Sequence, residues 1–380
     1  MTGAAVSHLV VAPAGPGRLE VAAHRIDRYP VHTGRGLTAR LAAVLKPVLE
    51  RLAAPGLVIA VDTGAAAHHL GALTTAALTT GLPFETVPVP AGEATKSPAG
   101  LEELLAAVHR AGAQRRTLLL GVGGGMVCDL VTTAAAHYLR GTPYALLPTT
   151  LLAQVDAAIG GKGGIDAFGA KNLLGAFHHP AAVVIDPDLL STLPEPEIRA
   201  GLAEVIKVAL ITDPALFAEL ERHEGRLPEG DALERIIHAA VTAKLRLLAQ
   251  DPFEQGDLRR LLNLGHCVGH PFEAASGYRV RHGEAVAAGI AVAAVNAHLT
   301  GTATLAERDR ILSLLDAYRL PTRIPETLRE TTWNGVAAVR RVRGGALHLV
   351  LPGAPGRCTI TDDLDRTAYD KALTELAARP

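Results

Sequence analysis

Two histidines four residues apart are the first feature of this chain that could do chemistry. The segment 261–273, LLNLGHCVGHPFE, has helical apolar spacing and places His266 and His270 on one face. A third histidine, His282, follows it, and Glu204 precedes it in GLAEVIK. Imidazoles and carboxylates are the usual ligands of a catalytic zinc, which takes three protein ligands and keeps a fourth position open. Because the chain contains 16 histidines, such a pair also arises by chance, so the spacing alone leaves open which side chains bind a metal.

Length, composition and charge describe an ordinary globular protein. The 380 residues are enough for two domains with separate cores. A hydrophobic fraction of 48% with 20% charged residues argues against a disordered chain. The 37 Lys and Arg residues balance 38 Asp and Glu residues, so no global positive field would attract nucleic acid or an anionic membrane. An anionic substrate would therefore need a local cluster of cations.

Cysteine usage and the apolar stretches predict a cytoplasmic protein. Three cysteines, Cys128, Cys267 and Cys358, are odd in number and far apart, which favours a reducing compartment over a disulfide framework. The first residues lack a basic segment leading into an apolar run, as a secretory signal would have. The longest apolar stretch, Ala285 to Ala297, is too short to span a bilayer. We therefore expect neither a membrane nor a nucleic acid as partner.

The first half of the chain has the pattern of an α/β domain. The run LVIAVD at 57–62 is short, apolar and bounded by turn residues and an acid, as in a buried parallel strand. Similar runs occur at 117–121, 144–148 and 182–186, and Ala-rich segments with helical periodicity lie between them, for example 100–111 and 129–138. Alternating strands and helices predict a parallel, Rossmann-like sheet covered on both faces.

The second half is predicted to be mostly helical. Helical patterns occur at 196–211, 232–250, 260–274, 284–299 and 306–318, and the next strand pattern is 347–351. We therefore expect an α/β nucleotide-binding domain at 1–190 and a helical domain at 191–380. The active site is expected in the cleft between them.

Two further segments suggest ligand binding. The sequence GVGGGMVCD at 121–129 follows a predicted strand and opens a helix, where glycines let the backbone approach a pyrophosphate. Its spacing is not the strict dinucleotide fingerprint, and a tight turn without a ligand is the alternative. Further on, Lys162 follows two glycines among small apolar residues, which is typical of a cleft lining.

Taken together, these segments resemble the sugar phosphate cyclases of the 3-dehydroquinate synthase family. The pieces GGGMVCDL, YLRGTPYALLPTTLLAQVDAAIGGKGG, AKNLLGAF, AGLAEVIK, LLNLGHCVGH and HGEAV stand in that family's order and spacing, and they cover about Asp62 to Ala287 closely. The resemblance implies an NAD-binding α/β domain followed by a mostly helical metal-binding domain. It also implies that the enzyme uses NAD and zinc, with cobalt as a possible substitute.

The resemblance assigns residues to each role. The implied metal ligands are Glu204, His266 and His282, and His270 would then face the substrate's phosphate instead of the metal. The implied NAD-binding residues are Asp62, Glu93, Lys96, Gly123, Gly124, Gly125, Asp129, Thr149, Thr150 and Lys171. The implied substrate pocket consists of Asp156, Lys162, Asn172, Lys207, Lys244, Arg259, Asn263, His270 and Arg340. Arg140 matches an arginine that similar enzymes lend to the neighbouring subunit's active site, which implies a homodimer.

Such enzymes oxidise a secondary alcohol of a sugar phosphate with NAD⁺, eliminate phosphate, return the hydride and close a carbocycle. Zinc would lower the pKa of the alcohol that it binds. Lys207 would hydrogen-bond the sugar hydroxyls or transfer a proton, and Asp156 would orient hydroxyls. Donors for the phosphate would be Asn172, Asn263, His270 and Arg140.

The substrate is less clearly specified. A carboxylate is best held by a guanidinium with nearby ammonium groups, and Arg259 with Lys162 and Lys244 supplies that set. We therefore expect 3-deoxy-arabino-heptulosonate 7-phosphate or its amino analogue, which would yield 3-dehydroquinate and place the enzyme in aromatic biosynthesis by the shikimate pathway. Several departures from the family pattern, among them Arg340 in place of a lysine and Pro271 inside a predicted helix, leave a specialised role open as an alternative.

Three alternatives remain open at this point. The chain could cyclise a heptulose 7-phosphate to a valiolone-type product, or it could be a metal-dependent polyol or alcohol dehydrogenase. The dehydrogenase would need no phosphate cluster. A non-enzymatic paralogue that binds NAD or a partner is the third alternative, which the intact predicted ligand set opposes.

Overall fold

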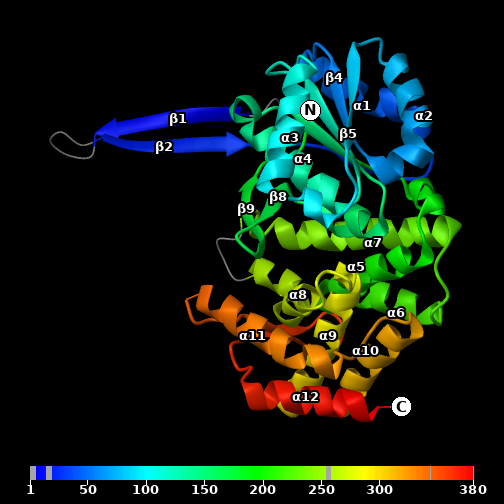
Figure 1. Ribbon diagram of the computed structural model, residues 1–380, viewed down its shortest axis with the longest axis vertical. Helices are drawn as coiled ribbons and strands as arrows, with labels where there is room; N and C mark the ends of the chain where they lie inside the picture. Colours follow the sequence, from blue (N-terminus) through cyan, green and yellow to red (C-terminus); the bar gives the residue numbers. More distant parts are fainter. Residues whose placement is uncertain (1–5, 14–18, 254–257, 343, 380) are drawn as a thin grey trace. The chain divides into compact units, whose positions relative to one another are not determined.

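The computed structural model describes residues 6–13, 19–253, 258–342 and 344–379 (Figure 1). The chain divides into two compact units. The first comprises 1–148 and 161–186, and the second comprises 149–160 and 187–380. The segment 149–160 thus belongs to the second unit although the chain returns to the first unit after it.

The first unit is built on a six-stranded parallel sheet with strand order β3-β10-β7-β6-β4-β5. Its strands are β3 (Val31–Thr33), β4 (Leu57–Asp62), β5 (Phe84–Val89), β6 (Leu118–Gly123), β7 (Tyr144–Pro148) and β10 (Ala182–Ile185). The central strands β6, β7 and β10 are buried throughout, as expected for a parallel sheet covered on both faces. The predicted α/β class is confirmed, and the strands at 57–62 and 144–148 have the predicted bounds.

Helices and two antiparallel hairpins complete the first unit. The helices are α1 (Leu41–Leu52), α2 (Thr63–Thr79), α3 (Pro98–Arg110) and α4 (Gly125–His137), with short 3₁₀ turns η1 (Thr38–Arg40), η2 (Glu93–Thr95) and η3 (Tyr138–Arg140). The hairpins are β1–β2 (Val6–Pro13, Leu19–Ile26) and β8–β9 (Lys162–Ala167, Ala170–Phe177). In Figure 1 the hairpin β1–β2 projects away from the sheet of this unit.

The strand order reverses beside β4, which creates the place where such sheets bind nucleotides. From β4 the chain moves outward to the edge strand β5 and then returns to β6 on the other side of β4. The carboxyl ends of β4 and β6 are therefore neighbours at a topological switch point. A Cβ at Gly123 would lie 2.9 Å from the Cβ of Asp62, so the glycine permits the two strand ends to approach.

The second unit is mostly helical, as predicted. It contains α5 (Glu195–Thr212), α6 (Pro214–Arg222), α7 (Gly230–Leu248), α8 (His266–Ala275), α9 (His282–Leu299), α10 (Leu305–Ala317), α11 (Glu326–Val342) and α12 (Arg366–Ala378). Shorter elements are the π-helical turn η4 (Ala153–Ala157), the 3₁₀ segments η5 (Pro187–Thr192) and η6 (Leu258–Asn263), and the hairpin β11–β12 (Leu349–Pro352, Cys358–Thr361). None of the helices within the described residues is long and apolar enough to cross a membrane.

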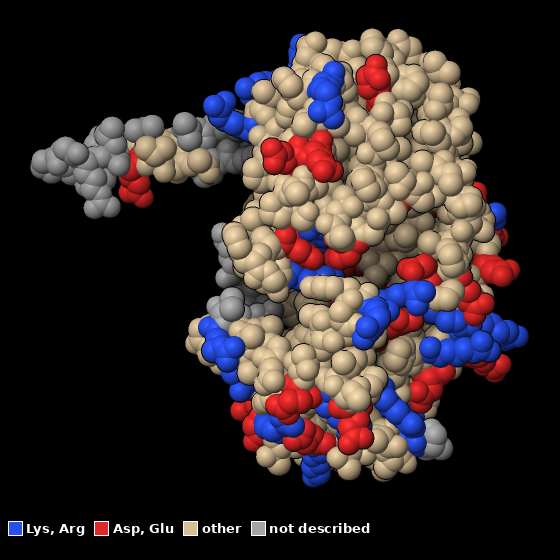
Figure 2. Space-filling model, in the orientation of Figure 1, with Lys and Arg blue, Asp and Glu red and all other residues tan. Residues whose placement is uncertain are grey.

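Helix α9 forms the centre of this unit. Its residues Ala285 to Ala297 are all buried, and it packs against α5, α8, α10 and α12. A helix that is apolar on every side is stable only when other elements surround it. On the face shown in Figure 2, acidic and basic side chains lie interspersed.

The helix predicted at 260–274 is divided into two elements. The 3₁₀ segment η6 ends at Asn263, and α8 begins at His266 after Gly265, whose φ is 80°. Only glycine adopts such an angle at low cost. The helix then continues through Pro271, so this proline lies inside α8, as the sequence indicated, and does not end it.

Candidate active site

The candidate site is built around Glu204 on α5. The residues from Ala200 to Ile211 are all buried, and Glu204 and Lys207 are each only 2% exposed. Because the two side chains are three positions apart, they share a helix face, and the Lys207 ammonium contacts Oε2 of Glu204. A buried carboxylate of this kind requires cations around it.

Glycines allow the histidine-bearing helices to approach this carboxylate. A Cβ at Gly283 would lie 1.9 Å from the carbonyl oxygen of Ala200, so the first turn of α9 can rest directly on the backbone of α5. A Cβ at Gly289 would lie 1.9 Å from the carbonyl oxygen of Gly265, which brings the start of α8 equally close to α9. The two contacts place the first residues of α8 and α9 beside Glu204.

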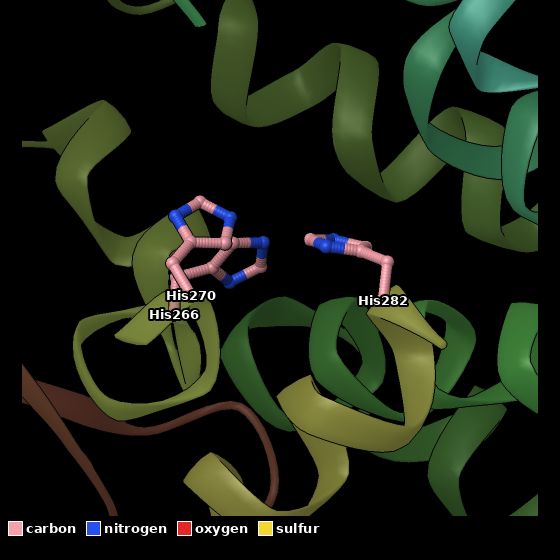
Figure 3. A group of neighbouring side chains, drawn as sticks. All are labelled: His266, His270 and His282. Carbon is pink, nitrogen blue, oxygen red and sulfur yellow. The ribbon is translucent and has the colours of Figure 1, made fainter. Parts of the chain in front are cut away.

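Three imidazoles converge at this point (Figure 3). His266 and His270 extend from α8, and His282 extends toward them from the start of α9. The ring centroid of His266 lies 4.8 Å from that of His270 and 5.3 Å from that of His282. One possible ligand atom from each ring lies within 4.8 Å of the others. The structure therefore brings the three histidines together.

The environment of Glu204 fits a divalent cation. Its Oε1 lies 3.4 Å from Nε2 of His282 and 3.7 Å from Nε2 of His266. Both of its oxygens are buried, and among the described residues neither accepts a hydrogen bond of normal geometry. Two imidazole nitrogens and a carboxylate are a common zinc ligand set. His270 lies on the same face, so the geometry alone admits it as a further ligand.

A chain of alternating charges extends from Glu204 within the second unit. Lys207 lies 3.7 Å from Oδ1 of Asp156, which sits in the π-helical turn η4. Lys244, from α7, places its ammonium 2.6 Å from both the backbone oxygen and Oδ1 of Asp156. The structure therefore brings four of the predicted site residues together as two carboxylates and two ammonium groups.

These neighbours shift the pKa of each group in a consistent direction. Burial would raise the pKa of Glu204, but the ammonium of Lys207 outweighs it and lowers that pKa to about 2. The pKa of Asp156 is likewise held well below its usual range, because Lys207 and Lys244 together outweigh the effect of burial. Burial opposes the charged form of Lys207, yet Asp156 and Glu204 raise its pKa, whereas burial lowers the pKa of Lys244.

The two imidazoles that face Glu204 differ in their protonation. Burial, followed by the charge of Lys207, lowers the pKa of His266 to about 4. Burial acts in the same direction on His282, but its contacts with the carboxylates of Glu204 and Glu273 outweigh it and raise the pKa of His282 to about 9. His266 is therefore neutral near pH 7, as a metal ligand must be.

Of the predicted NAD-binding residues of the first unit, Asp62 and Gly123 lie at the two strand ends that form the switch point. Asp62 ends β4, and its carboxylate accepts the N–H of Gly64 at 2.7 Å, which caps α2. The buried ammonium of Lys96 contacts the carboxylate of Asp129 on α4. The other predicted positions are Gly123 at the end of β6, Gly124 and Gly125 at the start of α4, and Glu93, whose carboxylate lies 3.0 Å from Nζ of Lys171.

The last two predicted NAD-binding residues, Thr149 and Thr150, begin the segment that belongs to the second unit. Thr149 is buried, and Oγ1 of Thr150 accepts the N–H of Ala153 at 3.2 Å. Their backbone thus leads directly into the turn that carries Asp156.

Two of the predicted substrate-binding residues, Arg340 and Lys162, contact other groups of the protein. The guanidinium of Arg340 donates to the backbone oxygens of Asp362 and Leu364, each at 2.9 Å, and so connects α11 to the segment before α12. Lys162 is exposed, with its ammonium 5.9 Å from the ring centroid of Phe177.

The remaining predicted positions are on turns and short elements. Asn172 adopts a φ of 52° in the hairpin β8–β9, where its N–H donates to Oδ1 of Asp166 at 2.8 Å. Arg140 lies in an exposed turn after α4, and Asn263 ends η6. The side chain of Arg259 is outside the described part of the chain.

Glu273 is a site residue that the sequence analysis did not identify. It is 5% exposed, and its Oε2 lies 3.1 Å from Nδ1 of His282. It stands three positions after His270 and seven after His266, so helical periodicity places all three on one face of α8. That spacing was the signal available in the sequence.

Comparison with known proteins identifies the family. The N-terminal and C-terminal family models of 3-dehydroquinate synthase match residues 86–200 and 201–338. The chain belongs to the 3-dehydroquinate synthase family. It is a sugar phosphate cyclase of that family, as the resemblance predicted.

Relatives within this family have different products. The chain is 46% identical to a 2-epi-valiolone synthase of Stigmatella aurantiaca over 370 residues, which are 94% of this chain and 90% of the relative. It is 41% identical to a 3-dehydroquinate synthase of Rhodospirillum rubrum, with 93% of each chain covered. A solved 2-epi-5-epi-valiolone synthase of Streptomyces hygroscopicus, with NAD⁺ and Zn²⁺ bound, is 31% identical with a TM-score of 0.87, covering 95% of this chain and 100% of that one.

Proposed function

We propose that this sugar phosphate cyclase is NAD- and zinc-dependent and releases inorganic phosphate as it closes a carbocycle. The observation that carries the proposal is the group of Glu204, His266 and His282, in which two imidazole nitrogens face one buried carboxylate without hydrogen-bond donors of normal geometry. Three such ligands leave a coordination position for substrate. Cobalt(II) suits the same ligand types.

The reaction would comprise oxidation of a secondary alcohol, β-elimination of phosphate, reduction of the same carbon and an intramolecular aldol closure. A zinc ion in this group would act as a Lewis acid that lowers the pKa of the substrate alcohol. NAD would bind to the first unit at the switch point, through the residues at the ends of β4 and β6. Sequence identity of 31% to an enzyme solved with NAD⁺ and Zn²⁺ supports both assignments.

The charged chain in the second unit provides the remaining groups. Lys207 would donate to a sugar hydroxyl next to the metal, because its ammonium lies beside the proposed metal ligand Glu204 and near Asp156. Asp156 would accept from another hydroxyl, and Lys244 keeps that carboxylate ionised and in place. His270, on the same face as His266, would donate to the substrate phosphate together with Asn263.

A heptulose 7-phosphate is the substrate that the contacts favour. A keto-acid phosphate carries a carboxylate that needs additional cations, but Lys244 is held by Asp156 and Arg340 by two backbone oxygens. These contacts leave fewer cations for a carboxylate than the sequence suggested. The similarity to relatives named for valiolone-type products supports the same choice.

The keto-acid phosphate, 3-deoxy-arabino-heptulosonate 7-phosphate, is the second candidate. Arg259 favours it, since a guanidinium suits a carboxylate, and so does the similarity to 3-dehydroquinate synthases. The test is to incubate the purified protein with NAD⁺, Zn²⁺ and each substrate while measuring phosphate and product mass. We expect the heptulose phosphate to react at least about tenfold faster, as judged by kcat/KM.

The possible outcomes of this test separate the proposals. Faster turnover of the keto-acid phosphate would overturn the choice of substrate and leave the cyclase assignment intact. Accumulation of NADH without phosphate release from either substrate would indicate a dehydrogenase and would overturn the proposed function.

The enzyme is also proposed to act as a homodimer in which Arg140 completes the partner's phosphate site. Arg140 is exposed, and both Leu139 and Arg140 have positive φ. Such backbone strain often occurs at functional positions, which supports a role for Arg140 at the surface of its unit. Inactive Arg140→Ala and His266→Ala variants, unfolded and refolded together, should regain about a quarter of wild-type activity if subunits pair at random. A mixture that stays inactive would contradict the shared site.

A further inference from the structure

The imidazole of His282 is held between two carboxylates, one at each ring nitrogen. Its Nε2 lies 3.4 Å from Oε1 of Glu204, and its Nδ1 lies 3.1 Å from Oε2 of Glu273. Glu273 comes from α8, whereas Glu204 comes from α5, so two helices fix the ring of a residue on a third. The Glu273 side chain is 6% exposed, which limits competition from water.

The contact to Glu273 determines which nitrogen can bind a metal. An ionised carboxylate only accepts hydrogen bonds, so Nδ1 of His282 must donate its hydrogen to Glu273. In the neutral ring the lone pair then lies on Nε2, the nitrogen that faces Glu204.

His266 is oriented in the same way by the backbone. Its Nδ1 lies 3.0 Å from the carbonyl oxygen of Leu264, and its Nε2 faces the same oxygen of Glu204. In both imidazoles an acceptor at Nδ1 orients the ring so that Nε2 faces Oε1 of Glu204. Of the two supports, only the one at Glu273 can be removed by substituting a side chain.

We propose that Glu273 is a positioning residue for the metal centre, which accepts the Nδ1 hydrogen of His282 and holds its Nε2 toward the ion. This inference rests on the proposed metal site of Glu204, His266 and His282. Glu273 would not touch the metal itself.

The expected effect is a graded loss of metal affinity. Removing a partner that orients a metal-bound histidine weakens metal binding by about 10- to 100-fold. Glu273→Ala removes the acceptor, so its loss of zinc affinity should lie near the upper end of this range, about 100-fold. Glu273→Gln keeps an oxygen of the same reach without the charge, so its loss should be about tenfold or less.

The experiment measures zinc binding directly. Metal-free full-length protein is titrated with zinc against a chromophoric chelator, and cobalt(II) absorption spectra report the ligand geometry. Thermal unfolding in excess chelator measures the stability of the protein without metal. For the Gln variant we expect weaker zinc binding and a changed cobalt spectrum with an unchanged unfolding temperature in chelator.

Glu284→Gln is the matched control. Glu284 lies two residues after His282, and its carboxylate accepts the N–H of Arg281 at 2.9 Å, which an amide oxygen can also do. This control removes a negative charge at the start of α9 without touching the imidazole, and we expect zinc affinity within about twofold of wild type.

Each outcome bears on a different claim. If both Glu273 variants bind zinc like the wild type while His282→Ala binds it weakly, the positioning role is wrong and the metal site stands. If His282→Ala also binds zinc like the wild type, the metal site itself is wrong. If Glu273→Gln lowers the unfolding temperature in chelator as much as it lowers it in zinc, Glu273 is structural and the proposal is overturned.

Discussion

Replacing Lys207 with methionine tests how the buried carboxylates share their cations. Asp156 would lose the Lys207 ammonium at 3.7 Å but keep that of Lys244 at 2.6 Å, whereas Glu204 loses the ammonium that contacts it. Breaking a buried ion pair by removing one partner costs about 3 to 5 kcal/mol. We expect the metal-free Lys207→Met protein to lose this much stability in the second unit.

Zinc should restore part of that loss. The ammonium of Lys207 repels a dication bound at Glu204, so the variant should bind zinc more tightly and gain more stability from it than the wild type. A ligand at about 100 times its Kd stabilises a protein by about 2.7 kcal/mol. The difference between variant and wild type should therefore be smaller in zinc than in chelator.

The chain offers a local probe for this measurement. Trp333 is its one tryptophan and lies on α11 of the second unit, with its ring 5.2 Å from that of Tyr369. Tryptophan fluorescence during thermal unfolding thus reports on this unit. For a unit of roughly 200 residues, a loss of about 3 to 5 kcal/mol lowers Tm by about 6 to 20 °C.

The control is Lys371→Met, which makes the same change at an exposed position on α12. It should leave Tm unchanged in chelator and in zinc. Two results would refute the reasoning about the buried charges. In the first, Lys207→Met is as stable as the wild type without metal. In the second, zinc raises the Tm of the variant no more than it raises that of the wild type.

Two further substitutions test the positions of the helices and the NAD site. Gly283→Ala places a Cβ against the backbone of α5, so α9 must move and carry His282 away from Glu204. Zinc affinity should therefore fall more than about tenfold. The control Gly71→Ala adds a Cβ in open space on α2 and should not change zinc affinity. Wild-type zinc affinity in Gly283→Ala would contradict the assigned helix contact. Lys96→Met leaves Asp129 without its ammonium, and NAD⁺ affinity measured by calorimetry should fall about tenfold with zinc binding unchanged. Undiminished NAD⁺ binding would remove Lys96 from the cofactor site.

Local sequence patterns predicted the continuous apolar strands of the sheet and missed a hairpin whose first strand contains glycines. The strands β4 and β7 were predictable because each is a continuous apolar run that is buried in the sheet. The hairpin β8–β9 was not predicted, because two of its glycines, Gly163 and Gly164, are typical of a flexible turn. A Cβ at Gly163 would lie 2.7 Å from the backbone of Thr133, so the glycine serves close packing against α4.

The metal site shows the limit of arguments from spacing. The pattern of His266 and His270 indicates a shared helix face, and both do lie on α8. The nearest carboxylate comes from α5 and a further imidazole from α9, and only tertiary packing decides which nitrogens face Glu204. Glu273 was missed for the same reason, since its partner belongs to another helix.

The most direct test of the central claim follows the hydrogen on the carbon that is oxidised. A heptulose 7-phosphate deuterated at that carbon is incubated with the enzyme, NAD⁺ and Zn²⁺, and the product is analysed by mass spectrometry alongside phosphate. The account predicts one phosphate per carbocyclic product, deuterium retained in that product and no accumulation of NADH. Deuterium recovered in free NADH without phosphate release would contradict it.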